Sequence, residues 1–241
     1  MTSSERTTLR MAVIGDGKMG RAVSALAAER GCDVVATIGS RENAGGSGIT
    51  AASLRGAEVA VEFTEPAAAP TNIEACVEAG VPVVCGTTGW YDQLDAVASE
   101  VRRHGGALLY AANFSLGVAV FLQVVEAAAR AAARAGDFDA HILETHHSAK
   151  KDAPSGTALL VQRAARAAAA NVPITSVRTG HVPGTHELIF DAPFEQLRLI
   201  HEARDRRVFA DGALLAARWL LGRKGVFGMT DLLDSLIPHD A

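Results

Sequence analysis

The fold is decided by residues 9–20, which read LRMAVIGDGKMG. The apolar run 9–14 predicts a short strand that leads directly into a G-x-G-x-x-G turn, and a helical pattern follows until Gly31, a residue type favoured just after a helix. Strand, glycine turn and helix in this order are typical of a dinucleotide-binding unit, whose glycines allow a tight turn, close approach of a pyrophosphate and close helix packing. The residues expected to hold the pyrophosphate are Gly15, Asp16, Gly17, Lys18, Met19 and Gly20.

Four more strands are predicted over residues 33–38, 58–63, 82–85 and 107–110, with helices over 71–79 and 91–104. This alternation predicts an α/β fold with a Rossmann-like, doubly wound parallel sheet. Ligands of such sheets bind beyond the carboxyl ends of the strands, where small and hydroxyl residues suit a nicotinamide ribose. Ordinary turn chemistry is the alternative explanation of these loops. The candidate contacts are Phe63, Thr64, Gly86, Thr87, Thr88, Ala111, Ala112, Asn113 and Phe114.

The second predicted strand ends in Gly39, Ser40 and Arg41. A site that prefers NAD usually carries Asp or Glu here to hold the ribose hydroxyls, and this position has neither. Ser40 could hydrogen-bond a 2′-phosphate and Arg41 could pair with it. We therefore expect NADPH to be preferred, with NADH possible; a solvated turn is the alternative.

From residue 116 the pattern changes. It predicts helices over 116–135 and 155–170 and strands over 138–147, 175–178, 185–190 and 195–203, and these last three alternate as antiparallel strands do. We expect a smaller α+β domain with a mixed sheet that has one face on helices. The last helices, over 211–221 and 229–236, should return to the first domain.

The segment richest in chemistry is residues 142–157, which read ILETHHSAKKDAPSGT. Ser155 is a natural N-cap for the helix that follows, so the backbone N–H groups of Gly156 and Thr157 can bind an anion. Together with His146, His147 and Lys150, this turn suits a small dicarboxylate, with an imidazole as proton donor near neutral pH. The alternative is a basic surface turn without chemistry.

Composition excludes several other classes of protein. The 241 residues carry a formal net charge of −4, which argues against nucleic acid as a partner. No apolar run approaches the roughly 18 residues of a membrane span, and residues 1–8 lack the apolar core of a secretory signal. The scattered histidines have no metal-ligand spacing, so no metal is expected. Because Cys32, Cys76 and Cys85 are odd in number and lie beside apolar residues, we expect buried free thiols and a cytoplasmic protein.

With these motifs in place, the chain resembles the dihydrodipicolinate reductase (4-hydroxy-tetrahydrodipicolinate reductase) family of lysine and diaminopimelate synthesis. The resemblance covers nearly the whole chain and is most specific at Glu144-Thr145-His146-His147 followed by Lys150 and residues 152–158, DAPSGTA. Further matching motifs are residues 61–64 (VEFT), 86–89 (GTTG), 112–115 (ANFS), 209–213 (FADGA) and 225–229 (GVFGM).

The resemblance implies that residues 1–112, completed by 212–241, bind the dinucleotide, and that residues 113–211 bind substrate and build a homotetramer. It implies hydride transfer from the nicotinamide to C4 of the unsaturated cyclic imine, with His146 as proton donor. Lys150 would assist as acid and hold a carboxylate, and His147, Ser155, Gly156 and Thr157 would complete the substrate site. A hinge closure that excludes water is expected because the two sites lie on different domains.

The chain departs from the family pattern in three places: a glycine turn one residue shorter than in some members, no acidic residue after the second strand, and a short connection between Ala170 and Ser176. The short connection leaves the assembly open. Arg178 and His186 match a recurrent pattern that we interpret first as structural or interfacial. The alternatives are a related two-domain nicotinamide reductase, such as an amino acid dehydrogenase, and a catalytically idle NADP-binding sensor.

Overall fold

A computed structural model describes residues 8–169 and 171–236. The chain divides into two compact units. The first extends to Phe114 and resumes at Arg207, and the second comprises Ser115–Arg206. The sequence placed these boundaries at 112/113 and 211/212.

The first unit is built on a six-stranded parallel sheet with the order β10-β5-β4-β3-β1-β2. The strands are β1 (Leu9–Ile14), β2 (Cys32–Ile38), β3 (Val59–Glu62), β4 (Val83–Cys85), β5 (Ala107–Tyr110) and β10 (Gly225–Phe227). The Rossmann-like parallel sheet is thus confirmed. The sequence missed β10, because a three-residue strand that begins with glycine has almost no periodic signal.

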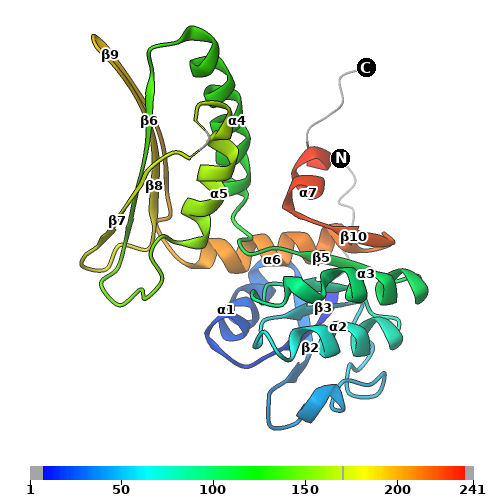
Figure 1. The fold of residues 1–241 in the computed structure, drawn as a ribbon. Helices are drawn as coiled ribbons and strands as arrows, with labels where there is room; N and C mark the ends of the chain where they lie inside the picture. Colours follow the sequence, from blue (N-terminus) through cyan, green and yellow to red (C-terminus); the bar gives the residue numbers. More distant parts are fainter. Residues whose placement is uncertain (1–7, 170, 237–241) are drawn as a thin grey trace, which may run out of the picture. The chain divides into compact units, whose positions relative to one another are not determined.

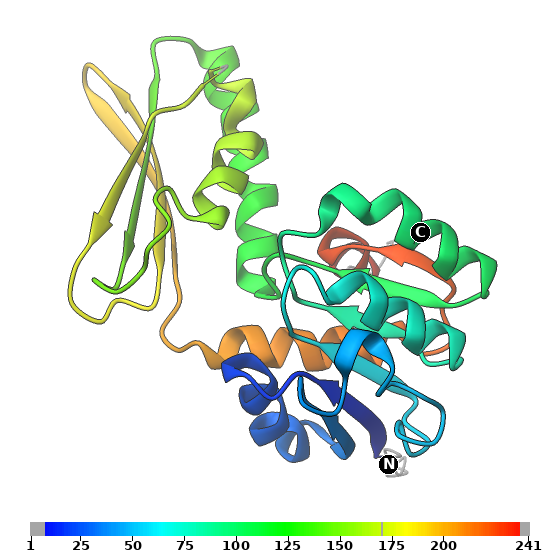
Figure 2. The same ribbon diagram turned by 60° about the horizontal axis from the view of Figure 1, so that its bottom comes forward.

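Helices cover both faces of this sheet (Figures 1 and 2). Ala12 and Ile14 of β1 pack into a core with α2 (Ala69–Glu78) and α3 (Leu94–Arg103), while Met11 and Val13, which point the other way, are also fully buried. The strands also contact α1 (Lys18–Ala27) and α6 (Arg207–Leu220), and α7 (Met229–Leu236) follows β10. Helix α6 starts at Arg207, earlier than expected, and with α7 it belongs to the first unit.

The second unit has a four-stranded mixed sheet with the order β7-β6-β8-β9. Helices α4 and α5 lie along one face of it, with a shared apolar core (Figure 1). The elements are α4 (Leu116–Ala135), β6 (Asp139–His146), α5 (Gly156–Ala164), β7 (Ile174–Arg178), β8 (Thr185–Ala192) and β9 (Glu195–Glu202).

The expected antiparallel pairing of β7 was wrong, because β7 pairs with β6 in parallel. The reason is that α5 carries the chain from β6 back to the start of β7, and a helical crossover of this kind returns the next strand in the same direction. The β6–β8 and β8–β9 pairs are antiparallel, so the mixed sheet itself is confirmed.

Helix α5 is shorter than the sequence suggested. It ends at Ala164, a 3₁₀ turn continues it to Ala167, and Ala170 lies outside the described residues. The Gln162 amide donates to the side chain of Asn171 and to the carbonyl of Val172, at 3.0 and 2.6 Å. These bonds tie the chain back along α5 toward β7, so it must leave the helix early.

The expectation that no segment reaches membrane-spanning length was wrong for α4. Its 20 residues include an 18-residue window with a mean hydropathy of 1.6, so α4 meets that criterion by length and composition. One such helix is weak evidence of a membrane span, and the face of α4 that carries Phe121, Val125 and Ala129 packs into the core of the second unit. The buried share of that window is 22%, and Val120 and Val124 on another face of α4 are each 46% exposed.

The three cysteines are free and buried, as expected. Burial raises the pKa of the Cys76 thiol to about 12, with a further contribution from the charge of Glu62. Cys32 and Cys85 are also at most 4% exposed.

Candidate functional site

The candidate cofactor residues of the first unit gather at the edge where the parallel strands end. The first residue after each strand bonds to the end of a neighbouring strand: the N–H of Phe63 donates to Ile14 at 2.9 Å, that of Gly86 to Glu62 at 2.9 Å and that of Ala111 to Cys85 at 3.1 Å. These bonds fix the loops after β1, β3, β4 and β5 side by side. The edge lies at a switch point of the sheet, because β1 is followed on one side by β2 and on the other by β3.

The three glycines of the turn have three different environments. Gly15 has a φ of +101°, and a Cβ there would lie 2.2 Å from the carbonyl oxygen of Phe63. A Cβ on Gly20 would lie 1.9 Å from the carbonyl oxygen of Gly15, whereas one on Gly17 would meet nothing within 4 Å. These are the three geometries that a tight turn, close helix packing and an open backbone for a pyrophosphate require. Asp16, Lys18 and Met19 lie between them at the start of α1.

The loops predicted to contact the nicotinamide form a compact surface around the ring of Phe63. A Cβ on Gly86 would lie 1.9 Å from that ring, so only glycine lets it lie there. The ring of Phe114 meets it edge-on, with centroids 6.0 Å apart. Thr64 donates its N–H to the hydroxyl of Thr87 at 2.7 Å, which ties the β3 and β4 loops together. Thr88 and Ala112 are exposed and Ala111 and Asn113 half-buried at the same edge.

The loop after β2 brings an acid next to Gly39 that the sequence pattern did not predict there. Ser40 and Arg41 are exposed, as a 2′-phosphate site would require. However, a Cβ on Gly39 would lie 3.0 Å from a carboxylate oxygen of Glu42 and 3.2 Å from the carboxyl carbon of Asp16. Two carboxylates therefore lie beside Gly39 in place of an acid at residue 39: Glu42, from the same loop, and Asp16, from the glycine turn. Only the folding of the 39–48 loop could reveal this.

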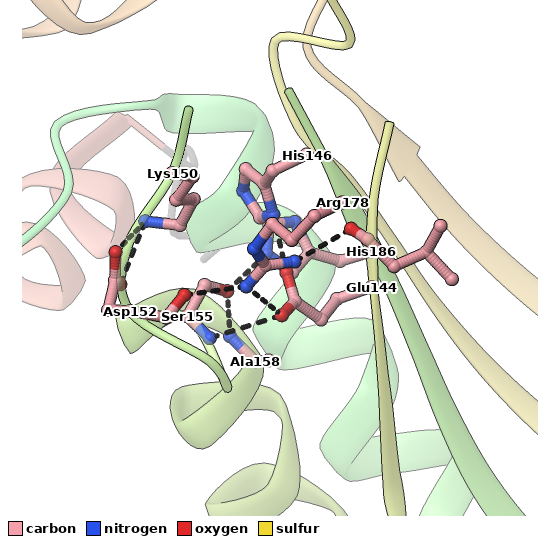
Figure 3. Close-up of polar contacts among 9 residues, drawn as sticks. Glu144, His146, Lys150, Asp152, Ser155, Ala158, Arg178 and His186 are labelled. Atoms are coloured by element: carbon pink, nitrogen blue, oxygen red, sulfur yellow. Dashed lines mark hydrogen bonds and ion pairs between the residues drawn. The ribbon is translucent and has the colours of Figure 1, made fainter. Parts of the chain in front are cut away.

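The second unit brings together a polar cluster at the ends of three strands (Figure 3). Glu144 and His146 lie two residues apart on β6 and so share one face of the sheet. In the sheet register Arg178 of β7 lies beside His146, and His186 of β8 lies beside Glu144. Strand pairing alone thus places these four side chains on one face, which we call the Glu144 cluster.

Glu144 is the centre of this cluster and is fully buried. One of its carboxylate oxygens accepts from the Arg178 guanidinium at 2.6 Å and from the backbone N–H of Ser155 at 3.3 Å, and the other contacts Nδ1 of His146. Burial opposes ionisation, but hydrogen bonds from Arg178 and Ser176 and the charge of His146 outweigh it and lower the pKa of Glu144 to about 2. The carboxylate is therefore charged at neutral pH.

His146 is 7% exposed, and its two ring nitrogens face different groups. Nδ1 is oriented by Glu144, which is how a carboxylate fixes the tautomer of an imidazole. On the Nε2 side, a Cβ on Gly184 would lie 3.0 Å away, so a side chain there would crowd the ring. Burial lowers the pKa of His146, although Glu144 opposes this, so the imidazole is mainly neutral near pH 7.

Ser155 connects the cluster to helix α5. Its side chain caps the helix by accepting from the N–H of Ala158 at 3.2 Å, which confirms the predicted N-cap, and it lies 3.0 Å from Nε2 of His186. The rings of His186 and His146 meet edge-on with centroids 5.1 Å apart. Burial and the charge of His146 lower the pKa of His186 to about 4, so this imidazole is neutral at pH 7.

The remaining candidate substrate residues surround the cluster without joining it. Lys150 pairs with Asp152 at 2.7 and 2.8 Å, to one side of the cluster (Figure 3). The carboxylate of Asp152 pairs with Lys150, while its backbone carbonyl accepts from Arg178 at 2.6 Å. His147 is half-buried beyond the end of β6, and Gly156 and Thr157 form the first turn of α5.

Arg178 and His186, expected to be structural or interfacial, thus lie in the cluster itself. Arg178 holds Glu144 and the loop carbonyl of Asp152, and His186 holds Ser155. Glu144, His146 and His186 offer ligand atoms within 4.8 Å of one another, which is compatible with a cation. The Arg178 guanidinium already neutralises the Glu144 carboxylate, so this ion pair explains the arrangement of the three residues without a bound cation.

Comparison with known proteins gives the same assignment for both parts of the chain. Residues 9–114 match the family described as dihydrodipicolinate reductase, N-terminus, and residues 117–233 match dihydrodipicolinate reductase, C-terminus. A 4-hydroxy-tetrahydrodipicolinate reductase of Stenotrophomonas maltophilia (strain R551-3) is 40% identical over 95% of this chain and 99% of its own. One of Christiangramia forsetii is 32% identical over 96% of this chain and 100% of its own.

A solved structure has the same fold. It is a dipicolinate-bound dihydrodipicolinate reductase from Paenisporosarcina sp. TG-14, similar with a TM-score of 0.77 and 20% identity over 93% of this chain and 99% of that one. The family matches cover both units, and the two relatives span nearly the full length of this chain. The chain therefore belongs to the dihydrodipicolinate reductase family.

Proposed function

We propose that this chain reduces 4-hydroxy-tetrahydrodipicolinate (dihydrodipicolinate) to tetrahydrodipicolinate with NAD(P)H, in lysine and diaminopimelate biosynthesis. The observation that carries the proposal is a buried imidazole, His146, oriented by an ionised carboxylate beside the N-terminus of a helix. The names of the two full-length relatives and the dipicolinate in the related structure support the same substrate class.

In this proposal the cofactor lies along the edge of the first unit, on the 15–20 turn and on the loops after β3, β4 and β5. The bound nicotinamide supplies the hydride that adds to C4 of the ring. Arg41 and Ser40 favour the 2′-phosphate of NADPH, whereas Glu42 and Asp16 beside Gly39 offer acceptors for the hydroxyls of NADH. We therefore propose NADPH as the preferred cofactor, with NADH accepted.

The substrate carboxylates are held in the second unit. Lys150 binds one of them by exchanging its partner Asp152 for the ligand, which costs little because Asp152 is exposed and can return to water. The backbone N–H groups of Gly156 and Thr157, the hydroxyl of Ser155 and the ring of His147 complete the grip at the start of α5. Orientation of the ring by these contacts is the main catalytic contribution of the site.

His146 gives the proton that completes the reduction. Its pKa is lowered in the free protein, so the ring must gain a proton when substrate binds. A dianionic dicarboxylate favours the charged imidazole, and Glu144 stabilises it from the other side. Substrate binding and protonation of His146 are therefore coupled. Lys150 assists as a second acid.

Turnover also requires the two units to meet, because the cofactor residues belong to one and the substrate residues to the other. We propose a hinge closure that excludes water. Small-angle scattering should give a smaller radius of gyration with NADPH and pyridine-2,6-dicarboxylate together than with NADPH alone. Equal radii would contradict the closure.

The assembly is proposed to be a cytoplasmic homo-oligomer, a tetramer by resemblance to the family. Among the described residues of the second unit, no helix covers one face of the sheet (Figure 1), and the apolar residues of this face include Leu143, Val177, Ile189 and Ile200, the last 57% exposed. A second copy could cover this face. Light scattering would give the mass, and a monomer would contradict this part of the proposal.

The test of the proposed function follows NADPH and NADH absorbance with ring substrate made in situ by a synthase from pyruvate and aspartate semialdehyde. Rapid oxidation that needs the ring substrate, and that pyridine-2,6-dicarboxylate inhibits, is expected. Lys150→Ala should raise the KM for the ring strongly, whereas Lys151→Ala, an exposed neighbour, is the matched control. No oxidation of either cofactor would overturn the proposal and favour an amino acid dehydrogenase or an idle sensor, even if NADPH still binds.

A further inference from the structure

A second polar network lies behind the loops at the cofactor edge of the first unit. It consists of Asn43, Glu62, Thr64, Asn72 and Thr87, and we call it the Asn72 network. Glu62, Asn72 and Thr87 are 0, 1 and 5% exposed, respectively. Polar groups at this depth are costly unless they are hydrogen-bonded, and these residues are hydrogen-bonded to one another.

Asn72 of α2 connects the two ends of the network. Its side-chain oxygen accepts from the amide of Asn43 at 2.7 Å, and its nitrogen donates to a carboxylate oxygen of Glu62 and to the hydroxyl of Thr64, both at 3.2 Å. The Thr64 hydroxyl also donates to Glu62. Every polar atom of the Asn72 side chain is therefore used, and its orientation is fixed by groups on both sides.

Glu62 is a fully buried carboxylate that neutral donors hold. None of the ion pairs among the described residues involves it. Its second oxygen accepts from the thiol of Cys85 at 3.1 Å. Burial and the charge of Glu62 raise the pKa of Cys85 well above its usual range, so this thiol stays protonated and remains a donor.

The ends of the network lie in the loops that the cofactor is proposed to contact. Asn43 belongs to the 39–48 loop, which carries Ser40 and Arg41, and its oxygen accepts from the N–H of Gly48 at 3.1 Å. At the other end, the N–H of Thr64 donates to the hydroxyl of Thr87, which joins the β3 and β4 loops. The same network thus spans the adenosine side and the nicotinamide side of the edge.

We propose that Asn72 is a positioning residue that couples the adenosine-side loop to the nicotinamide-side loops, so that the two halves of the dinucleotide are bound together rather than independently. This inference rests on the proposed cofactor site. Loss of the Asn72 side chain would leave both loops in place but no longer connected by hydrogen bonds. Cofactor affinity would fall, and the nicotinamide would be held less well for hydride transfer.

The test is a double-mutant cycle on the two ends of the network. Asn43→Ala removes the end in the 39–48 loop, and Thr64→Val removes the hydroxyl at β3 with little change of shape. The dissociation constant of NADPH is measured by the fluorescence of the bound cofactor, which does not depend on turnover. The cycle is then repeated in an Asn72→Ala background, and Asn171→Ala in the second unit is the matched control.

We expect the double variant to differ by about fivefold from the product of the two single effects, which is the coupling expected of groups in one hydrogen-bond network. In the Asn72→Ala background the effects should multiply simply, and Asn171→Ala should leave the dissociation constant unchanged. Simple multiplication in the wild-type background would overturn the inference, whether or not Asn72→Ala folds. Absence of NADPH binding by the wild type would instead overturn the cofactor site itself.

Discussion

The two candidate sites of this chain differ in the groups that form them. The edge of the first unit is made mainly of backbone: a glycine turn, N–H groups that join neighbouring strands, and a glycine that admits the ring of Phe63. The Glu144 cluster of the second unit is made of side chains that strand pairing brings together from β6, β7 and β8. The first site depends on glycines, whose missing side chains leave room for neighbouring groups, and the second depends on buried charges that must be paired.

This difference predicts how each site fails. In a site formed by backbone, a glycine cannot gain a Cβ where another part of the chain is in contact with it. It can gain a Cβ where the space beside it is empty. A buried charged cluster tolerates changes of shape better than loss of a partner, because an unpaired buried charge is costly. Substitutions and a change of pH can test this contrast.

Arg178→Ala should have the largest effect. It leaves the fully buried Glu144 without its guanidinium partner, and we expect a loss of about 4 kcal/mol in the free energy of unfolding. Chemical unfolding followed by circular dichroism measures it, with Arg166→Ala, an exposed arginine of the same unit, as control. A loss below about 1 kcal/mol would mean that water reaches the carboxylate and that the cluster is not a closed charged core.

Gly20→Ala and Gly17→Ala should separate packing from binding at the glycine turn. The Cβ added by Gly20→Ala would collide with the backbone of Gly15, and we expect a loss of about 3 kcal/mol in stability. The Cβ added by Gly17→Ala would meet nothing within the protein, so stability should change by less than about 0.5 kcal/mol while NADPH binds more weakly. Thermal unfolding and cofactor titration measure the two effects. Equal losses of stability in both variants would contradict the assigned roles.

The stability of the second unit should depend on pH through His186. Its pKa is lowered to about 4 in the folded protein, so the unfolded chain binds the proton more readily. Stability is therefore full above the ordinary histidine range and should fall by about 3 kcal/mol as pH drops from about 6.5 to about 4. Glu144, whose pKa is about 2, should add a further loss at still lower pH. Unfolding curves of wild type and His186→Gln between pH 4 and 8 would reveal this; identical pH dependence in the two would refute it.

Arg41→Ala should have the smallest effect, and it acts on cofactor choice rather than stability. Loss of a charge that pairs with the 2′-phosphate should lower the preference for NADPH over NADH by about tenfold, or about 1.4 kcal/mol. The ratio of kcat/KM for the two cofactors measures it, and Arg102→Ala on α3 is the exposed control. An unchanged ratio would assign cofactor choice to Glu42 and Asp16 instead.

The sequence predicted the loops at the edge of the first unit far better than the side-chain pairing in the second unit. The 15–20 turn and the loops after β3, β4 and β5 could be located because glycines and strand ends carry local signals. By contrast, the pairing of Glu144 with Arg178 depends on the parallel register of β6 and β7, and the local pattern suggested an antiparallel strand there. Glu42 was missed for a related reason, because the tight 39–48 loop brings it back to Gly39.

The same reasoning explains the remaining errors. Strand β10 is too short to show a period, and the early end of α5 depends on a side-chain bond from Gln162 to residues beyond the helix. The partner of Lys150 could not be chosen from sequence, since Glu144 and Asp152 are both near it in the chain. Local periodicity and motif order therefore predict elements and edges, while long-range pairing decides which charges meet.

The central claim, that His146 in the Glu144 cluster is the proton donor of a ring reduction, is tested most directly by His146→Gln. His141→Gln is the matched control, because His141 lies on the same strand with its side chain on the opposite face. We predict that His146→Gln lowers kcat by about a thousandfold while NADPH and pyridine-2,6-dicarboxylate still bind, and that His141→Gln leaves kcat unchanged. A kcat within about threefold of wild type for His146→Gln would contradict the account.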